Sequence, residues 1–277
     1  MVAGMRIFMT GATGYIGGAV ASTLRHHGHD VTALVRPESE SRRLRDLGVV
    51  ILSGDLDALP ALGEALDGYD SYIHIAFAPQ SDRTAIDALA HRGHFIYTSG
   101  VWVLGNTRGA DETSAPNPLP LVAWRVAHEG LALQSPSNAV LRPGCVYGGK
   151  QSLCARWFAA VDQNQPVEIV GEGRNHWAMI DLHDLAACYV AIVEQRASGV
   201  MHAIDDTRAT LDECAQALAP RVEISHVPGE GDFADALLVD QTIESRITRE
   251  RLGWTPKRTF TNSIEEQWRE WRSRDSG

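Results

Sequence analysis

Four glycines crowd one short segment near the start of the 277-residue chain, IFMTGATGYIGGAV at residues 7–20. An apolar run precedes them and a helical pattern follows, so Gly11, Gly14 and Gly17 stand at three-residue spacing between a strand and a helix. Glycine allows a tight turn and close approach to phosphate, and the first N–H groups of a helix attract negative charge. This arrangement predicts a site for the pyrophosphate of a dinucleotide; a glycine turn that binds nothing is the alternative. The predicted contacts are Gly11, Thr13, Gly14, Tyr15, Ile16 and Gly17.

An arginine, Arg36, ends the second predicted strand, about 20 residues after the last glycine of the loop. Proteins that bind NAD usually carry an acid there, which holds the adenosine ribose. A cation instead pairs with a 2′-phosphate, so Arg36 favours NADP(H) over NAD(H). An ordinary solvated arginine is the alternative.

Short apolar runs alternate with helical periods through the first half of the chain, which predicts a parallel sheet covered by helices. We expect strands at 5–10, 31–35, 49–52, 71–76, 94–98 and 138–141, and helices at 15–27, 39–47, 57–67, 82–92 and 120–134.

The pattern becomes irregular after residue 150. We expect helices at 152–163 and 183–195, strands at 167–170 and 178–181, and a final helix at 263–273. In that last helix Ser263 and Glu266 predict a capping box, and Ile264, Trp268 and Trp271 form one apolar stripe. The predicted fold is α/β: a Rossmann doubly wound parallel sheet over residues 1–150 and a smaller C-terminal α/β substrate lobe over 151–277. We expect some C-terminal segments to return to the first domain.

Six segments occur in the order found in one large family: MTGATGYIGGAV (9–20), GDL (54–56), YIHIAF (72–77), FIYTSGVWVLG (95–105), LRPGCVYG (141–148) and MIDLHDLA (179–186). The chain thereby resembles the extended short-chain dehydrogenase/reductases, also called the NAD-dependent epimerase/dehydratase family. The resemblance implies that Asp184 anchors the second lobe. It also implies that the cofactor contacts Asp55, Leu56, Ala76, Phe77, Thr98, Pro143 and Val146.

The resemblance breaks at the catalytic residues. The family uses a Ser or Thr hydroxyl with Tyr-x-x-x-Lys, in which the tyrosine moves the proton while the lysine lowers the pKa of the tyrosine and holds the nicotinamide ribose. The chain has only two lysines, and none of its six tyrosines precedes a lysine by four places. Alignment places Gly100 at the hydroxyl position, Leu121 at the tyrosine and Arg125 at the lysine.

Three residues remain as catalytic candidates: Ser99, Arg125 and His128. Arg125 binds the ribose as a cation, but a pKa above about 12 excludes it from relaying a proton. A shifted register places Trp124 and His128 at the Tyr–Lys pair, and His128 titrates near neutrality. Packing of the helix is the alternative role for Trp124 and His128.

Four tryptophans are expected to contact the substrate. In the segment VGEGRNHWAMID, Trp177 stands where family members that use nucleotide sugars carry an arginine, which disfavours such a substrate. Because tryptophan offers a large apolar contact area, an apolar or aromatic small molecule is expected. The predicted contacts are Trp102, Trp124, Trp157 and Trp177; ordinary core packing is the alternative.

Composition limits the classes of partner that we expect this protein to bind. A formal charge of −10 disfavours nucleic acid and anionic membranes. No apolar run approaches the roughly 18–20 residues that span a bilayer, and the four cysteines show no metal-binding spacing. We expect a cytoplasmic protein without a metal, as a monomer or homodimer.

These observations predict an NADP(H)-dependent oxidoreductase that acts on a small apolar or aromatic carbonyl or enone with a non-standard proton donor. Two alternatives stay open. One is a non-catalytic NADP(H)-binding regulator, and the other is an epimerase, dehydratase or isomerase that uses bound cofactor.

Overall fold

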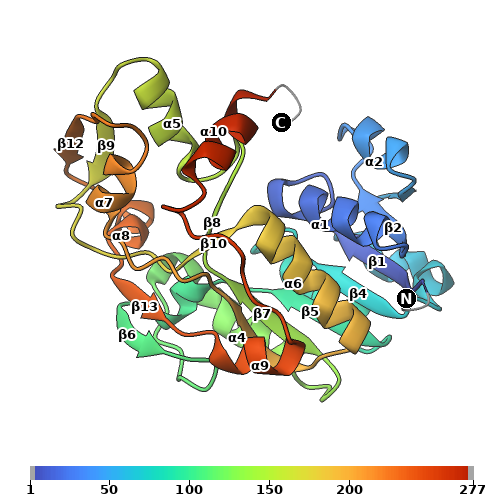
Figure 1. Ribbon diagram of the computed structural model, residues 1–277. Helices are drawn as coiled ribbons and strands as arrows, with labels where there is room; N and C mark the ends of the chain where they lie inside the picture. Colours follow the sequence, from blue (N-terminus) through green and yellow to red (C-terminus); the bar gives the residue numbers. More distant parts are fainter. Residues whose placement is uncertain (1–3, 274–277) are drawn as a thin grey trace.

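A seven-stranded parallel sheet forms the centre of the molecule, a computed structural model that describes residues 4–273 (Figure 1). Its strands are β1 (Arg6–Thr10), β2 (Asp30–Val35), β3 (Val50–Ser53), β4 (Ser71–His74), β5 (His94–Thr98), β7 (Ala139–Pro143) and β11 (Gly199–Ala203). They lie in the order β3-β2-β1-β4-β5-β7-β11. The order reverses between β1 and β4, which is the topological switch point of a doubly wound sheet. The predicted Rossmann fold is confirmed.

Helices cover both faces of this sheet. Helices α1 (Tyr15–His26) and α6 (Leu182–Gln195) pack together on one face, in front of the sheet in Figure 1. The 3₁₀ helix η1 (Leu59–Leu66) and helices α3 (Asp82–Leu89) and α4 (Trp124–Ala132) cover the other face. Successive side chains of a strand point to opposite faces. Ile7 and Met9 of β1 therefore join the core beneath α1 and α6, while Phe8 joins the core beneath η1, α3 and α4.

Three pairs of short parallel strands and several small helices build the remainder. The pairs are β6 (Thr107–Ala110) with β13 (Gln241–Ile243), β8 (Cys145–Tyr147) with β10 (Met179–Asp181), and β9 (Val167–Val170) with β12 (Ile224–Val227). The remaining helices are α2 (Arg42–Asp46), η2 (Val101–Leu104), η3 (Pro120–Val122), α5 (Ala155–Asp162), α7 (Leu211–Gln216), α8 (Asp232–Leu237), α9 (Arg246–Leu252) and α10 (Ile264–Arg272).

The second lobe has its own core, in which Trp157, Trp177 and Phe260 are buried. The sheet nevertheless takes its edge strand β11 and its covering helix α6 from beyond residue 150. The two parts are therefore interleaved along the chain.

Two local predictions are wrong. The helix expected at 57–67 forms as 3₁₀ turns, because Gly63 interrupts it with φ +50°. The capping box at 263–266 does not form, because the Ser263 hydroxyl donates to the Thr259 carbonyl at 2.8 Å and Glu266 pairs with Arg258. The apolar stripe of α10 does pack on the lobe's core.

Two features are absent from residues 4–273. No helix in that range is both long and apolar enough to cross a bilayer. Nor does the range hold a group of three or more His, Cys, Asp or Glu side chains placed to bind a metal ion.

Candidate functional site

The glycine loop connects β1 to α1, and its glycines have different structural roles. A Cβ on Gly17 would stand 2.0 Å from the Gly11 carbonyl oxygen, and one on Gly11 (φ +78°) would stand 2.6 Å from the Ala76 nitrogen. Both positions are therefore closed by packing. A Cβ on Gly14 would meet only the Gly11 oxygen, at 3.3 Å. Because Gly14 also lines the cleft described below, its missing side chain leaves room for a ligand.

The first turn of α1 is open to an anion. Gly14 is its N-cap and offers no side chain to bond the first N–H groups, and the turn holds no acidic residue. Unsatisfied N–H groups and the positive end of the helix dipole therefore face the same space.

A cleft of about 650 Å³ lies over the switch point of the sheet. Its volume is in the range of cofactor sites. Its walls include most of the cofactor contacts expected from the sequence, namely Gly11, Thr13, Gly14, Tyr15, Ile16, Gly17, Arg36, Asp55, Leu56, Ala76 and Phe77. Thr98, Arg125, Pro143 and Val146 are not part of these walls. Thr98, Arg125 and Pro143 are buried, and Val146 is half-buried.

Arg36 stands at one end of the cleft, directly after β2. Its side chain is 67% exposed, and its Nε lies 3.5 Å from a carboxylate oxygen of Glu38. Asp55, on the same wall, uses its Oδ1 to accept the Ala58 N–H at 2.9 Å. Among residues 4–273, Glu38 is the one ion-pair partner of Arg36, and an exposed pair of this kind is weak.

The Arg125 guanidinium packs against two aromatic rings, those of Phe77 and Trp124, whose centroids are 5.7 Å apart. The guanidinium carbon is 5.1 Å from the ring centroid of Phe77 and 4.7 Å from that of Trp124. Its Nη1 donates to the Thr98 carbonyl at 2.6 Å, and the residue is 7% exposed. Within residues 4–273 no carboxylate lies at ion-pair distance from Arg125. The site thus holds a nearly buried positive charge that has no direct counter-ion.

Gly100 and Leu121 are the residues aligned with the family's hydroxyl and tyrosine, and Ser99 precedes Gly100. The Ser99 hydroxyl is buried and has no hydrogen-bond partner among residues 4–273. Gly100 is extended (φ 179°), and a Cβ on it would meet nothing within 4 Å. Leu121 is half-buried on η3, which precedes α4.

The tryptophans divide into two groups. Trp157 and Trp177 are 1% and 2% exposed and stack with ring centroids 5.8 Å apart. The indole N–H of Trp177 donates to the Leu237 carbonyl at 3.0 Å. These two residues lie in the core of the second lobe, which favours the core-packing alternative over substrate binding for them. Trp102 and Trp124 are half-buried near the site and stay candidates.

His128 lies one turn after Trp124 on α4, with the two rings 5.2 Å apart. Burial lowers the pKa of His128, so its ring is neutral at neutral pH. Its Nδ1 stands 4.0 Å from a carboxylate oxygen of Asp82, a fully buried residue that sequence reasoning missed. The only sequence signal for Asp82 was its place at the start of a predicted helix.

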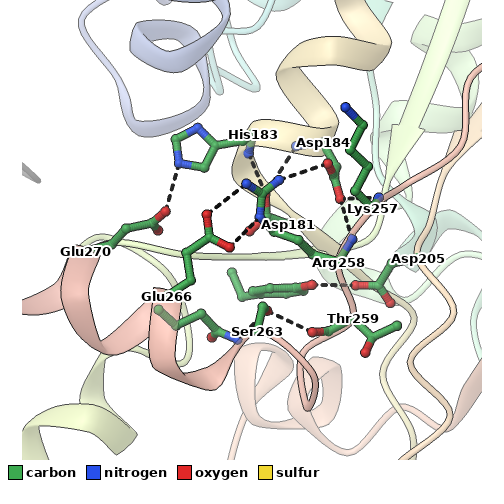
Figure 2. Close-up of polar contacts among 12 residues, drawn as sticks. Asp181, His183, Asp184, Asp205, Lys257, Arg258, Thr259, Ser263, Glu266 and Glu270 are labelled. Atoms are coloured by element: carbon green, nitrogen blue, oxygen red, sulfur yellow. Dashed lines mark hydrogen bonds and ion pairs between the residues drawn. The ribbon is translucent and has the colours of Figure 1, made fainter.

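The C-terminal strap (residues 254–272) is fastened to the start of α6 by an ionic network (Figure 2). Asp184 accepts the backbone N–H groups of Lys257 and Arg258 at 2.8 and 2.9 Å, and its other oxygen accepts the Arg258 guanidinium at 3.1 Å. Arg258 also bonds Glu266. These contacts agree with the anchoring role that the resemblance implies for Asp184. Sequence reasoning missed Arg258.

The sheet order, the glycine loop and the cleft define a Rossmann-type α/β protein. Residues 4–101 match the NmrA-like family. An uncharacterized protein of Schizosaccharomyces pombe is 30% identical over 280 residues, which cover 91% of this chain and 95% of the yeast protein. The chain belongs to the same family as that protein, and its motifs and fold agree with the resemblance to the extended short-chain dehydrogenase/reductases.

Two reductases are also similar. The ceramide reductase of Caulobacter vibrioides is 23% identical over 84% of this chain and 77% of that enzyme. The 4-hydroxy-2-methyl-3-oxo-4-farnesyl-3,4-dihydroquinoline-1-oxide ketoreductase of Stigmatella aurantiaca is 35% identical over 68% of this chain and 62% of that enzyme. Among solved structures, MoeE5 in complex with UDP-glucuronic acid and NAD superposes with a TM-score of 0.80 at 22% identity, over 95% of this chain and 98% of MoeE5. That likeness shows the fold.

Proposed function

We propose that this protein is an NADP(H)-dependent reductase that acts on a keto group in a small, apolar substrate. One observation carries the proposal: the cleft joins the open N-terminus of α1 to an available arginine at the end of β2. The names of the two similar reductases support it, since one is a ketoreductase of a farnesyl-bearing compound and the other acts on ceramide.

The residues of the cleft fit the cofactor. The N–H groups of the first turn of α1 would hold the pyrophosphate beside Gly14, and Arg36 would pair with the 2′-phosphate. Asp55 and Leu56 would border the adenine. When bound, the nicotinamide supplies the hydride for the reduction.

Arg125 is the proposed electrostatic catalyst. Its guanidinium stays protonated and cannot deliver a proton. Held by the Thr98 carbonyl and by two rings, it is oriented in advance, and no carboxylate of residues 4–273 pairs with it. Such a fixed charge stabilises the negative charge that develops on a carbonyl oxygen.

We assign the proton to the Ser99 hydroxyl, with water as its source. Ser99 adjoins the open space at Gly100, and its hydroxyl has no partner among residues 4–273. His128 is less suited, because it lies between Trp124 and Tyr97 and its pKa is lowered. Trp102, Trp124 and Leu121 offer apolar surface to the rest of the substrate.

Consumption of NADPH with a panel of 3-oxoacyl esters and aryl ketones tests this proposal. We expect turnover of at least one ketone and a loss of about 100-fold or more in kcat/KM for Arg125→Met. Arg246→Met, which removes an exposed arginine paired with Glu250, is the matched control and should leave kcat/KM unchanged. Binding of NADPH without turnover of any panel member contradicts the proposal.

A non-catalytic NADP(H)-binding protein is the second candidate. It is favoured by Gly100 and Leu121, which put no proton-bearing side chain at the family's hydroxyl and tyrosine positions. The same panel separates the two, because this candidate binds NADPH at one site per chain and converts nothing.

A further inference from the structure

Five polar side chains form a buried cluster on the α3–α4 face of the sheet, below the switch point. They are Thr10 of β1, His74 of β4, Tyr97 of β5, Asp82 of α3 and His128 of α4. The residues of the strands and of α3 are at most 1% exposed: Thr10, His74, Tyr97 and Asp82. The His128 side chain is 13% exposed. The cluster therefore joins three strand ends to both helices of this face.

Asp82 is the centre of the cluster. Its Oδ1 accepts the His74 Nε2–H and the Ala78 backbone N–H, both at 3.2 Å, and its Oδ2 accepts the Tyr97 hydroxyl at 3.0 Å. Because His74 donates through Nε2, its Nδ1 accepts the Thr10 hydroxyl at 2.7 Å. The Ala78 backbone N–H can only donate, so the loop bond requires an acceptor oxygen at Asp82.

The partners of this buried carboxylate are unusual. No lysine or arginine of residues 4–273 pairs with Asp82; its partners are the His74 ring, the Tyr97 hydroxyl and the Ala78 N–H, and His128 Nδ1 lies 4.0 Å away. Replacing such a group by an apolar one of similar size often stabilises a protein. Its presence therefore points to a need for fixed geometry at this place.

The geometry that Asp82 fixes belongs to the candidate site. Thr10 lines the cleft, and so do Ala76, Phe77 and Ala78 of the wall loop (residues 75–81). Asp82 bonds this loop at the Ala78 N–H. The loop in turn touches the glycine loop so closely that a Cβ on Gly11 would stand 2.6 Å from the Ala76 nitrogen. A shift of the wall loop would reach both sides of the cleft.

We propose that Asp82 is a positioning residue for the dinucleotide site: it holds the wall loop against the ends of β1, β4 and β5, so that the cleft keeps its width and Phe77 keeps its place over Arg125. This inference rests on the proposed function for the identity of the ligand, and on the contacts above for the role of Asp82.

The test compares Asp82→Leu with wild type in two readouts. Leucine is of similar size and accepts no hydrogen bond, so the Ala78 N–H loses its acceptor. We expect the backbone N–H groups of residues 75–81 to exchange with solvent about tenfold faster or more, measured without ligand. We also expect the Kd for NADPH, measured on folded protein, to rise about tenfold or more. Asp87→Leu, at an exposed position of the same helix, is the control and should change neither value.

A second variant separates positioning from a loss of stability. In Asp82→Asn the amide oxygen can still accept the Ala78 N–H while the amide NH2 donates to the Tyr97 hydroxyl, so the exchange rates and the NADPH Kd should stay within about threefold of wild type. A purely structural role would lower the free energy of unfolding and leave the Kd of the folded protein unchanged. Unchanged exchange in the wall loop overturns the proposal. If wild type binds no NADPH, the proposed function fails, while the exchange rates still decide whether Asp82 holds the loop.

Discussion

Gly17 lies so close to Gly11 that a Cβ on Gly17 would stand 2.0 Å from the Gly11 carbonyl oxygen and 3.0 Å from the Cα of Ala12. The contacted atoms are backbone, so they cannot turn aside as a side chain would. We expect Gly17→Ala to lower the free energy of unfolding by about 3 kcal/mol or more, because it forces α1 away from the glycine loop. Urea denaturation measures this.

Gly18→Ala is the matched control in the same helix. A Cβ there would lie 3.5 Å from the Ala12 oxygen, an ordinary contact. Alanine is favoured over glycine in a helix by about 1 kcal/mol, so Gly18→Ala should leave stability unchanged or raise it. Equal losses in the two variants would contradict the packing described for Gly17.

Removal of the Asp184 carboxylate should release the C-terminal strap. Asp184→Ala leaves two backbone N–H groups and part of the Arg258 guanidinium without their acceptor. We expect a loss of about 3–5 kcal/mol in the free energy of unfolding, as for other broken buried pairs. Asp46→Ala removes an exposed partner of Arg42 and should cost less than about 1 kcal/mol. A loss no larger than in this control would refute the anchoring role.

Asp205 should make stability depend on pH. It is 1% exposed, accepts the Tyr147 hydroxyl at 2.8 Å, and burial raises its pKa to about 6. Because this folded-state pKa lies above the unfolded value of about 3.9, the protonated form favours folding. The contribution is present at low pH and is lost as pH rises through about 6.

Asp205→Asn removes this titration, while Asp181, whose pKa burial also raises to about 6, titrates in both proteins and cancels. Between about pH 4 and pH 8, the free energy of unfolding of the variant should gain about 3 kcal/mol relative to wild type, since each pKa unit corresponds to about 1.4 kcal/mol. Urea denaturation at several pH values measures the gap. If this difference in the free energy of unfolding does not change with pH, folding does not raise the pKa of Asp205.

The fold could be predicted largely because buried parallel strands appear in the sequence as short apolar runs. Strands expected at 94–98 and 167–170 form at those residues as β5 and β9. The helix expected at 57–67 could not be corrected from the sequence, because glycine adopts positive and negative φ alike and its type alone does not reveal the φ of +50° at Gly63. Ser263 fits a capping box by type, but its hydroxyl and Glu266 found other partners in the strap.

The glycine loop and Arg36 could be located because the chemistry of phosphate binding is local and follows one strand and one helix. The tryptophans could not be sorted in the same way. Trp124 and Trp157 both lie on helices, and only the packing of the second lobe decides that Trp157 is core. Sequence reasoning missed Asp82 for a similar reason. The cluster around it joins Thr10 to His74 across 64 residues, and no local pattern signals such a contact.

The most direct measurement is native mass spectrometry of the protein mixed with equal amounts of NADPH and NADH, for wild type, Arg36→Ala and Arg42→Ala. Arg42 is an exposed arginine on α2 that does not line the cleft, so it serves as the control. The account predicts one NADPH per chain in preference to NADH, loss of that preference in Arg36→Ala, and its retention in Arg42→Ala. Binding of neither nucleotide, or preference for NADH in wild type, would contradict it.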